Sequence, residues 1–218
     1  MSVILILVFA AIALYVWNAK AYEFRIQQYG ISQKNAFGEN GFLYTETAKL
    51  TYAASAVYVN GVYTGTTYTF TFFPDTHTGK KDLTYTCHMK EMDEELENLR
   101  GHVSRVVAGK MAQQFSEENP VQWTDSLRFL PEGLEYTASG WFSKKPPQII
   151  RYQDISSYGI HEGYLHLWLE GAENSSIQET VQKENFFPGY ELLVMLLSPD
   201  DEAPPETDDG SEEVPGEE

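Results

Sequence analysis

The residues that could carry out chemistry in this chain are few, and its histidines come first. Of the five, only His161 and His166 lie close together, on either side of a Glu162-Gly163 turn. A protein-bound metal needs three or four ligands that converge in space, and the nearest further donor, Glu162, lies in the turn itself. We therefore interpret His166 as an ordinary strand-face histidine, and we predict no metal and no cofactor.

The single cysteine, Cys87, is followed directly by His88, as a nucleophile might be by its base. Consecutive side chains of a strand point to opposite faces, however, so these two cannot form the hydrogen bond that such a pair needs. A single cysteine also excludes an intramolecular disulfide and a cysteine-rich zinc site. We interpret Cys87 as a buried thiol.

Four carboxylates, those of Asp93, Glu94, Glu95 and Glu97, crowd the start of an expected helix. Paired carboxylates can carry out acid–base catalysis, but acids at this position also stabilise the positive end of a helix, and Asp93 can cap it. The chain has none of the motifs of serine hydrolases, zinc proteases, phosphate-binding loops or dinucleotide folds. We predict no catalytic residues, with an enzyme of unrecognised type as an alternative.

The net charge excludes one class of partner. Residues 199–218 contain ten acids and neither Lys nor Arg, so removing them from the total of −17 leaves −7 for residues 1–198. An acidic body repels phosphate backbones, which argues against nucleic-acid binding. The acidic segment 199–218, which also contains four prolines, is expected to be a disordered tail.

The N-terminal segment is strongly apolar, with no charge or polar residue from residue 3 to residue 17. A helix over residues 1–19 would be roughly 28 Å long, close to the bilayer core of about 30 Å. Trp17 fits an interfacial aromatic belt, and Lys20 follows directly. The pattern predicts a transmembrane helix over 1–19 that anchors a single-pass protein in the cell membrane, with its soluble body in the cytoplasm.

The same segment has an alternative interpretation as a cleaved signal peptide. Ala19-Lys20-Ala21 has the form of a cleavage site, although no positively charged residue precedes the apolar run. Cleavage would give an exported surface protein.

Strand patterns dominate the rest of the chain. Thr66 to Phe73 places Tyr68, Phe70 and Phe72 on one face and threonines on the other, and Asn60-Gly61 is a strong hairpin turn. The period changes to that of an amphipathic helix between Asp93 and about Phe115. Strands are expected at 22–26, 42–47, 50–59, 66–73, 83–89, 127–129, 134–142, 148–152, 155–160, 164–169 and 177–181, and a final helix after residue 188.

The two halves share an order of elements, which indicates an internal repeat. Phe24-Arg25-Ile26 is followed after three residues by Gly30, and Leu127-Arg128-Phe129 after three residues by Gly133. The motifs "LRFLPEGLEY", "IIRYQDISSYGI" and "GYLHLWLEG", with the helix after residue 188, resemble bacterial pleckstrin-homology-like (PH-like) domains. The resemblance implies strands in a bent sheet or partial barrel closed by a helix, and a binding or assembly role.

The expected fold is therefore α+β and mostly β. Its parts are a transmembrane helix (1–19), a first PH-like unit with a long helix (22–118), a second PH-like unit (121–198) and the acidic tail (199–218). In eukaryotic pleckstrin-homology domains the loop equivalent to Lys144-Lys145 often contacts lipid phosphates, so these two lysines are the candidate ligand-facing residues. We predict a membrane-anchored, non-catalytic interaction or scaffold module with a protein or peptide partner.

Overall fold

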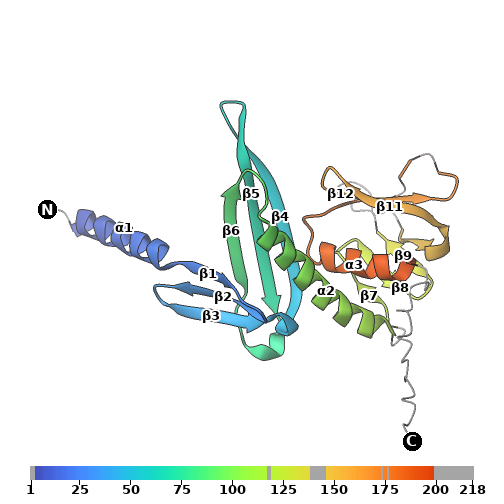
Figure 1. The fold of residues 1–218 in the computed structure, drawn as a ribbon, viewed down its shortest axis with the longest axis horizontal. Coiled ribbons are helices and arrows are strands. Elements are labelled where there is room, and N and C mark those ends of the chain that lie inside the picture. Colours follow the sequence, from blue (N-terminus) through green and yellow to red (C-terminus); the bar gives the residue numbers. More distant parts are fainter. Residues whose placement is uncertain (1–2, 117–118, 138–145, 173, 176, 199–218) are drawn as a thin grey trace, which may run out of the picture.

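The computed structural model describes residues 3–116, 119–137, 146–172, 174–175 and 177–198, and in them three α-helices join small antiparallel sheets (Figure 1). The elements, in chain order, are α1 (Val3–Ala21), β1 (Glu23–Ile26), β2 (Gly30–Asn35), β3 (Gly38–Leu43), β4 (Thr47–Val59), β5 (Val62–Pro74), β6 (Leu83–Met89), α2 (Glu94–Ser116), β7 (Val121–Gln122), β8 (Leu127–Leu130), β9 (Gly133–Tyr136), β10 (Gln148–Arg151), β11 (Ile155–His161), β12 (Tyr164–Leu169), β13 (Ile177–Thr180) and α3 (Phe186–Leu197).

The first half consists of two three-stranded sheets, β1-β2-β3 and β4-β5-β6, followed by α2. The alternation in β5 has the predicted result, because Tyr68, Phe70 and Phe72 are buried. The threonines on the opposite face pair across the strands, as in the contact of Thr69 Oγ1 with Thr86 Oγ1 at 3.3 Å. A period of two thus gives this sheet one apolar and one polar face.

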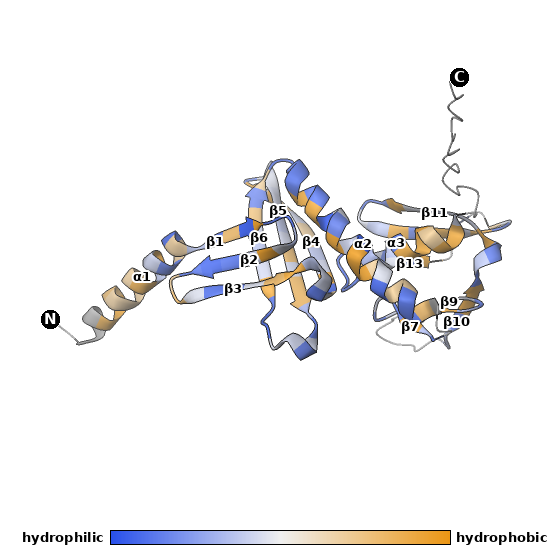
Figure 2. Ribbon diagram, turned by 60° about the horizontal axis from the view of Figure 1, so that its bottom comes forward, coloured by the Kyte–Doolittle hydropathy of each residue, from blue (hydrophilic) through white to orange (hydrophobic). Residues whose placement is uncertain are grey.

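Helix α2 begins where the sequence predicted. The carboxylate of Asp93 accepts a hydrogen bond of 2.8 Å from the backbone N–H of Glu95, as an N-cap does. Leu96, Leu99 and Val103 follow at three- and four-residue steps and are buried. In both ribbon views α2 crosses from the β4-β5-β6 sheet to the second half of the chain (Figures 1 and 2).

The second half repeats the order of the first: a sheet β10-β9-β8-β7, a sheet β11-β12-β13 and a helix, α3. Gly30 of β2 and Gly133 of β9 occupy equivalent places, since a Cβ at either position would meet the backbone of the next strand at 2.4 or 2.1 Å. The short 3₁₀ turns Tyr44–Glu46 and Tyr152–Asp154 also correspond.

The two halves share one hydrophobic core, which contains buried residues from both series of strands and from α2 and α3. The guanidinium of Arg100 lies 4.4 Å from the ring centre of Phe187 and 5.2 Å from that of Tyr52. Residues of α2, α3 and β4 therefore meet around one cation.

The N-terminal helix corrects a central expectation. Residues Val3–Ala21 are helical, yet no helix among the described residues is long and apolar enough to cross a membrane. The uninterrupted apolar part ends at Trp17, so it covers only about 22 Å of a core of about 30 Å. Asn18 and Lys20 occupy the last turn, and the end of α1 nearest β1 is hydrophilic in Figure 2. The predicted transmembrane helix over 1–19, the single-pass architecture and the cell-membrane localisation are therefore wrong.

The C-terminal end of α1 is instead attached to the first sheet. The side-chain oxygen of Asn18 accepts a hydrogen bond of 3.2 Å from the backbone N–H of Ala36, in the β2–β3 turn. The rings of Trp17 and Phe37 meet edge to face at 6.1 Å. Trp17, which ends the apolar run, and Asn18, which follows it, thus make contacts within the protein.

Candidate partner-binding groove

Some of the residues singled out from the sequence lie outside the described part of the chain, and others lie within it. Lys144 and Lys145, and the acidic segment 199–218, lie outside the described residues. The rings of His161 and His166 are 6.3 Å apart; His166 stacks on Trp168 and contacts the Ser175 hydroxyl at 3.2 Å. No group of three or more His, Cys, Asp or Glu in the described part of the chain could hold a metal.

The Cys87-His88 pair is divided between the two faces of β6. His88 Nδ1 lies 3.3 Å from Thr67 Oγ1 on the polar face, whereas Cys87 packs against the core. Burial raises the pKa of the Cys87 thiol above its ordinary value, so the reactive thiolate is disfavoured. The geometry therefore favours the interpretation of Cys87 as a buried thiol over a nucleophile paired with His88.

A groove runs along the N-terminal end of α2, between β1 and β6. It consists of two adjoining hollows of about 570 and 290 Å³, which share Ile26, Asp93 and Glu95. Neither lining contains a Lys or Arg. We call it the acidic groove.

The apolar floor of the acidic groove comes from three elements. Phe24 and Ile26 project from β1, and the ring of Phe24 stacks on Tyr85 of β6 at 4.5 Å. Leu96 and Leu99 are contributed by the buried face of α2. The alternation of β1 and the helical period of α2 direct these side chains to one place.

The rim of the groove carries negative charge. Asp93 is engaged as the helix cap, but in the described residues no ion pair neutralises Glu94 or Glu95. Burial raises the pKa of the nearby Tyr44 phenol, and the Glu95 carboxylate adds to that rise. The Tyr44 O–H donates to the Gln27 carbonyl at 2.7 Å. The ring of His102 lies edge-on to the Tyr44 ring, with 4.7 Å between the ring centres.

The groove also lies beside a sheet edge. Among the strands of the described residues, β1 pairs only with β2, so its other edge is unpaired there. Tyr22, just before β1, donates its hydroxyl proton to the Thr84 carbonyl of β6 at 3.2 Å. An edge with unpaired backbone groups next to an apolar floor is a common docking geometry for extended peptides.

Sequence reasoning found only one side of this groove. The acids were interpreted from the sequence as the solvated start of a helix. That interpretation accounts for Asp93 but does not predict the apolar side chains of β1 that lie across the groove. The alternation of Phe24 and Ile26 was the available signal for the floor; its position opposite α2 depends on contacts far apart in sequence.

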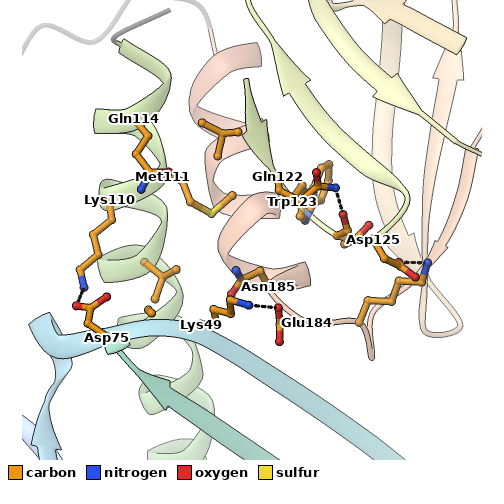
Figure 3. A pocket seen from close by; sticks show the side chains of 15 residues that line it. Lys49, Asp75, Lys110, Met111, Gln114, Gln122, Trp123, Asp125, Glu184 and Asn185 are labelled. Carbon is orange, nitrogen blue, oxygen red and sulfur yellow. Dashed lines mark hydrogen bonds and ion pairs between the residues drawn. The ribbon is translucent and has the colours of Figure 1, made fainter. Parts of the chain in front are cut away.

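Another hollow, of about 690 Å³, lies between the two halves of the chain, at the C-terminal part of α2 (Figure 3). Its cations are paired across or beside it: Lys49 with Glu184 at 2.8 Å and Lys110 with Asp75 at 2.8 Å. The side-chain oxygen of Asn185 accepts a hydrogen bond from the backbone N–H of Leu50 in β4, and the backbone N–H of Asn185 donates one to the Leu50 carbonyl.

This hollow is better described as a junction between the two halves of the chain than as a ligand-binding site. Lys183 bonds Asp125 at 2.5 Å and the buried Glu179 at 2.8 Å, and Glu179 also accepts from the Ser126 hydroxyl. The indole N–H of Trp123 donates to the Phe186 carbonyl at 2.8 Å. Because these charged groups already satisfy one another, they leave little net charge for a ligand.

The acidic groove, with an apolar floor and carboxylates that lack cationic partners in the described residues, is therefore the candidate functional site. Its chemistry suits non-covalent binding of apolar and cationic groups. In comparisons with protein-family models, curated proteins and solved structures, no match to this chain was found.

Proposed function

We propose that this protein is a non-catalytic interaction module that binds a segment of a partner protein in the acidic groove. The segment would present large apolar side chains to Phe24, Ile26 and Leu99, and Lys or Arg to Glu94 and Glu95. Affinity would come from burial of apolar area, and partner choice from charge.

The observation that carries this proposal is the pair of Glu94 and Glu95 beside an apolar floor. Elsewhere the acids of the folded body are often matched, as Glu97 is with Arg100 and Asp75 with Lys110. A basic segment could neutralise the groove and gain charge-assisted hydrogen bonds there. The formal charge of −17 would also attract a cationic partner over longer distance.

The resemblance of the second half to PH-like domains supports the same role, because such a module binds or assembles and performs no assigned reaction. The alternatives, an enzyme of unrecognised type and an exported surface protein, are not proposed, since no specific geometric observation favours either.

The test begins with the intact chain, immobilised and panned against a random-peptide phage library. We expect the enriched peptides to combine Lys or Arg with large apolar residues. The selected peptide should bind the E94Q/E95Q variant at least about tenfold more weakly, a loss of about 1.4 kcal/mol. Asp93 is left unchanged because it caps α2.

The matched control removes two acids from another surface. Glu132 and Glu170 are exposed and lie in the second half of the chain, so E132Q/E170Q makes the same change in net charge. Equal loss of affinity in both variants would reduce the effect to general attraction by an acidic protein and reject the groove as the site.

A further inference from the structure

Strands β4 and β5 form a long hairpin whose tip projects beyond the rest of the sheet (Figure 1). Each strand has 13 residues, and Asn60 and Gly61 at the turn have φ of 51° and 81°. Both values are positive, as a two-residue type I′ turn requires. We call residues 50–73 the finger.

The finger is chemically unlike the rest of the chain. Residues 50–73 contain no Asp, Glu, Lys, Arg, His or Pro, in a protein with a formal charge of −17. At the tip, Tyr58, Val59, Val62 and Tyr63 are 63, 55, 66 and 45% exposed. The surface near the tip is therefore both neutral and apolar.

One side of the finger is a free sheet edge. In the sheet β4-β5-β6, strand β4 is outermost. The base of its outer edge is covered, since Asn185 bonds both backbone groups of Leu50 and Gln182 reaches the Ala54 carbonyl at 3.3 Å. Because outward backbone groups alternate along a strand, those of Ala56 and Tyr58 continue this edge.

Nothing in the described part of the chain bonds the outward groups of Ala56 and Tyr58. Natural edge strands are usually protected by Lys, Pro or a bulge. Here the irregularity near the tip puts the extra residue, Thr64, in β5, so β4 itself runs regularly from Lys49 to Val59. The free edge has none of these protections.

We propose that two copies of this chain associate by antiparallel pairing of the free β4 edges over residues 55–59. Two bodies of the same negative sign repel each other, so a second copy can approach more favourably along a long uncharged segment such as the finger. Identical strands that pair antiparallel about a two-fold axis form a closed, self-complementary contact. The projecting tip keeps the acidic bodies apart.

Sedimentation equilibrium of the intact chain tests this pairing. We expect a monomer–dimer equilibrium that A56K weakens by at least about tenfold, because a lysine would bring like charges together across the paired edges. A56P, which removes the outward N–H itself, should act in the same direction. T86K is the control: Thr86 is exposed on β6 of the same sheet, away from the β4 edge, so the same added charge should leave the dimer intact.

Amide hydrogen exchange gives a second readout. The Tyr58 amide should exchange more slowly as the wild-type concentration rises, whereas in A56K its exchange should not depend on concentration. A monomeric wild-type chain would overturn the proposal. So would association that survives both A56K and A56P, which would point to the exposed apolar side chains of α1 instead.

Discussion

At the scale of single residues, the packing of the second half depends on the close contact between Gly189 and Trp123. A Cβ at position 189 would lie 2.0 Å from an indole carbon of Trp123. That indole is 1% exposed and fixed by its hydrogen bond to the Phe186 carbonyl. It therefore cannot move aside without losing buried contacts.

Gly189→Ala should accordingly lower the free energy of unfolding by about 2–3 kcal/mol through overpacking. Gly109→Ala is the control, because Gly109 is exposed in α2 and its added Cβ meets nothing within 4 Å. It should raise stability by about 0.5–1 kcal/mol through helix propensity. Urea denaturation of both variants measures the difference, and equal effects would contradict the packing account.

Lys183 is the other residue whose contacts should contribute strongly to the stability of the fold. Burial alone would lower the pKa of its ammonium, but its hydrogen bonds to Asp125 and Glu179 outweigh that effect and raise the pKa above the ordinary 10.5. Without it, the carboxylate of Glu179, 4% exposed, would have no cationic partner.

We expect Lys183→Met to cost about 3 kcal/mol at neutral pH, since an unpaired buried charge remains. Lys49→Met, which breaks the exposed pair with Glu184, should cost no more than about 1 kcal/mol. Thermal or urea unfolding distinguishes the two; similar small losses would mean that Glu179 takes up a proton or water instead.

The pH dependence has a defined sign. A raised pKa means that folding favours the protonated lysine, so its contribution is complete below the unfolded value near 10.5 and is lost as pH rises through the folded value. The stability difference between wild type and Lys183→Met should therefore shrink above about pH 10.5. Buried tyrosines also titrate there; those away from Lys183 are common to both proteins and cancel in the difference, whereas Tyr136 does not, because the Lys183 charge acts on its pKa.

At the scale of elements, Arg100 connects two helices and a strand. Its guanidinium lies over the rings of Tyr52 of β4 and Phe187 of α3, which meet edge to face at 82°, while one nitrogen bonds Glu97 at 3.2 Å. A guanidinium is more weakly hydrated than a lysine ammonium and therefore suits this contact with aromatic rings better.

Arg100→Met should keep much of the apolar contact but lose the cation–π attraction, at a cost of about 1–2 kcal/mol. Arg105→Met is the control on the exposed face of the same helix and should change stability by less than about 0.5 kcal/mol. Equal unfolding midpoints for the two variants would show that the cation–π contacts add nothing.

At the scale of the whole molecule, the two proposed contacts should respond to salt in opposite directions. Raising NaCl from about 0.01 M to about 1 M shortens the Debye length from about 30 to about 3 Å. Binding of a basic peptide to the acidic groove should weaken, because its attraction is screened. Pairing of two fingers should strengthen, because the repulsion between acidic bodies is screened. Parallel titrations by fluorescence anisotropy and sedimentation measure both; a common direction would contradict one assignment.

Much of the local structure was determined by the sequence. The alternation of Tyr68, Phe70 and Phe72 predicted the buried face of β5, and Asp93 predicted the start of α2. Both are short-range properties, fixed by the period of the side chains and by capping. The apolar run from residue 3 to residue 17 likewise predicted a helix, but its length relative to a bilayer was misjudged, because Asn18 and the first two residues were counted with it.

The tertiary structure alone decided which of these elements meet. The floor of the acidic groove combines Phe24 with Leu99, and the free edge of β4 begins where Gln182 and Asn185 stop covering it. These contacts join residues far apart in sequence. They are set by the mutual packing of the described sheets with α2 and α3 around one core. Periodicity describes only near neighbours and carries no information about them.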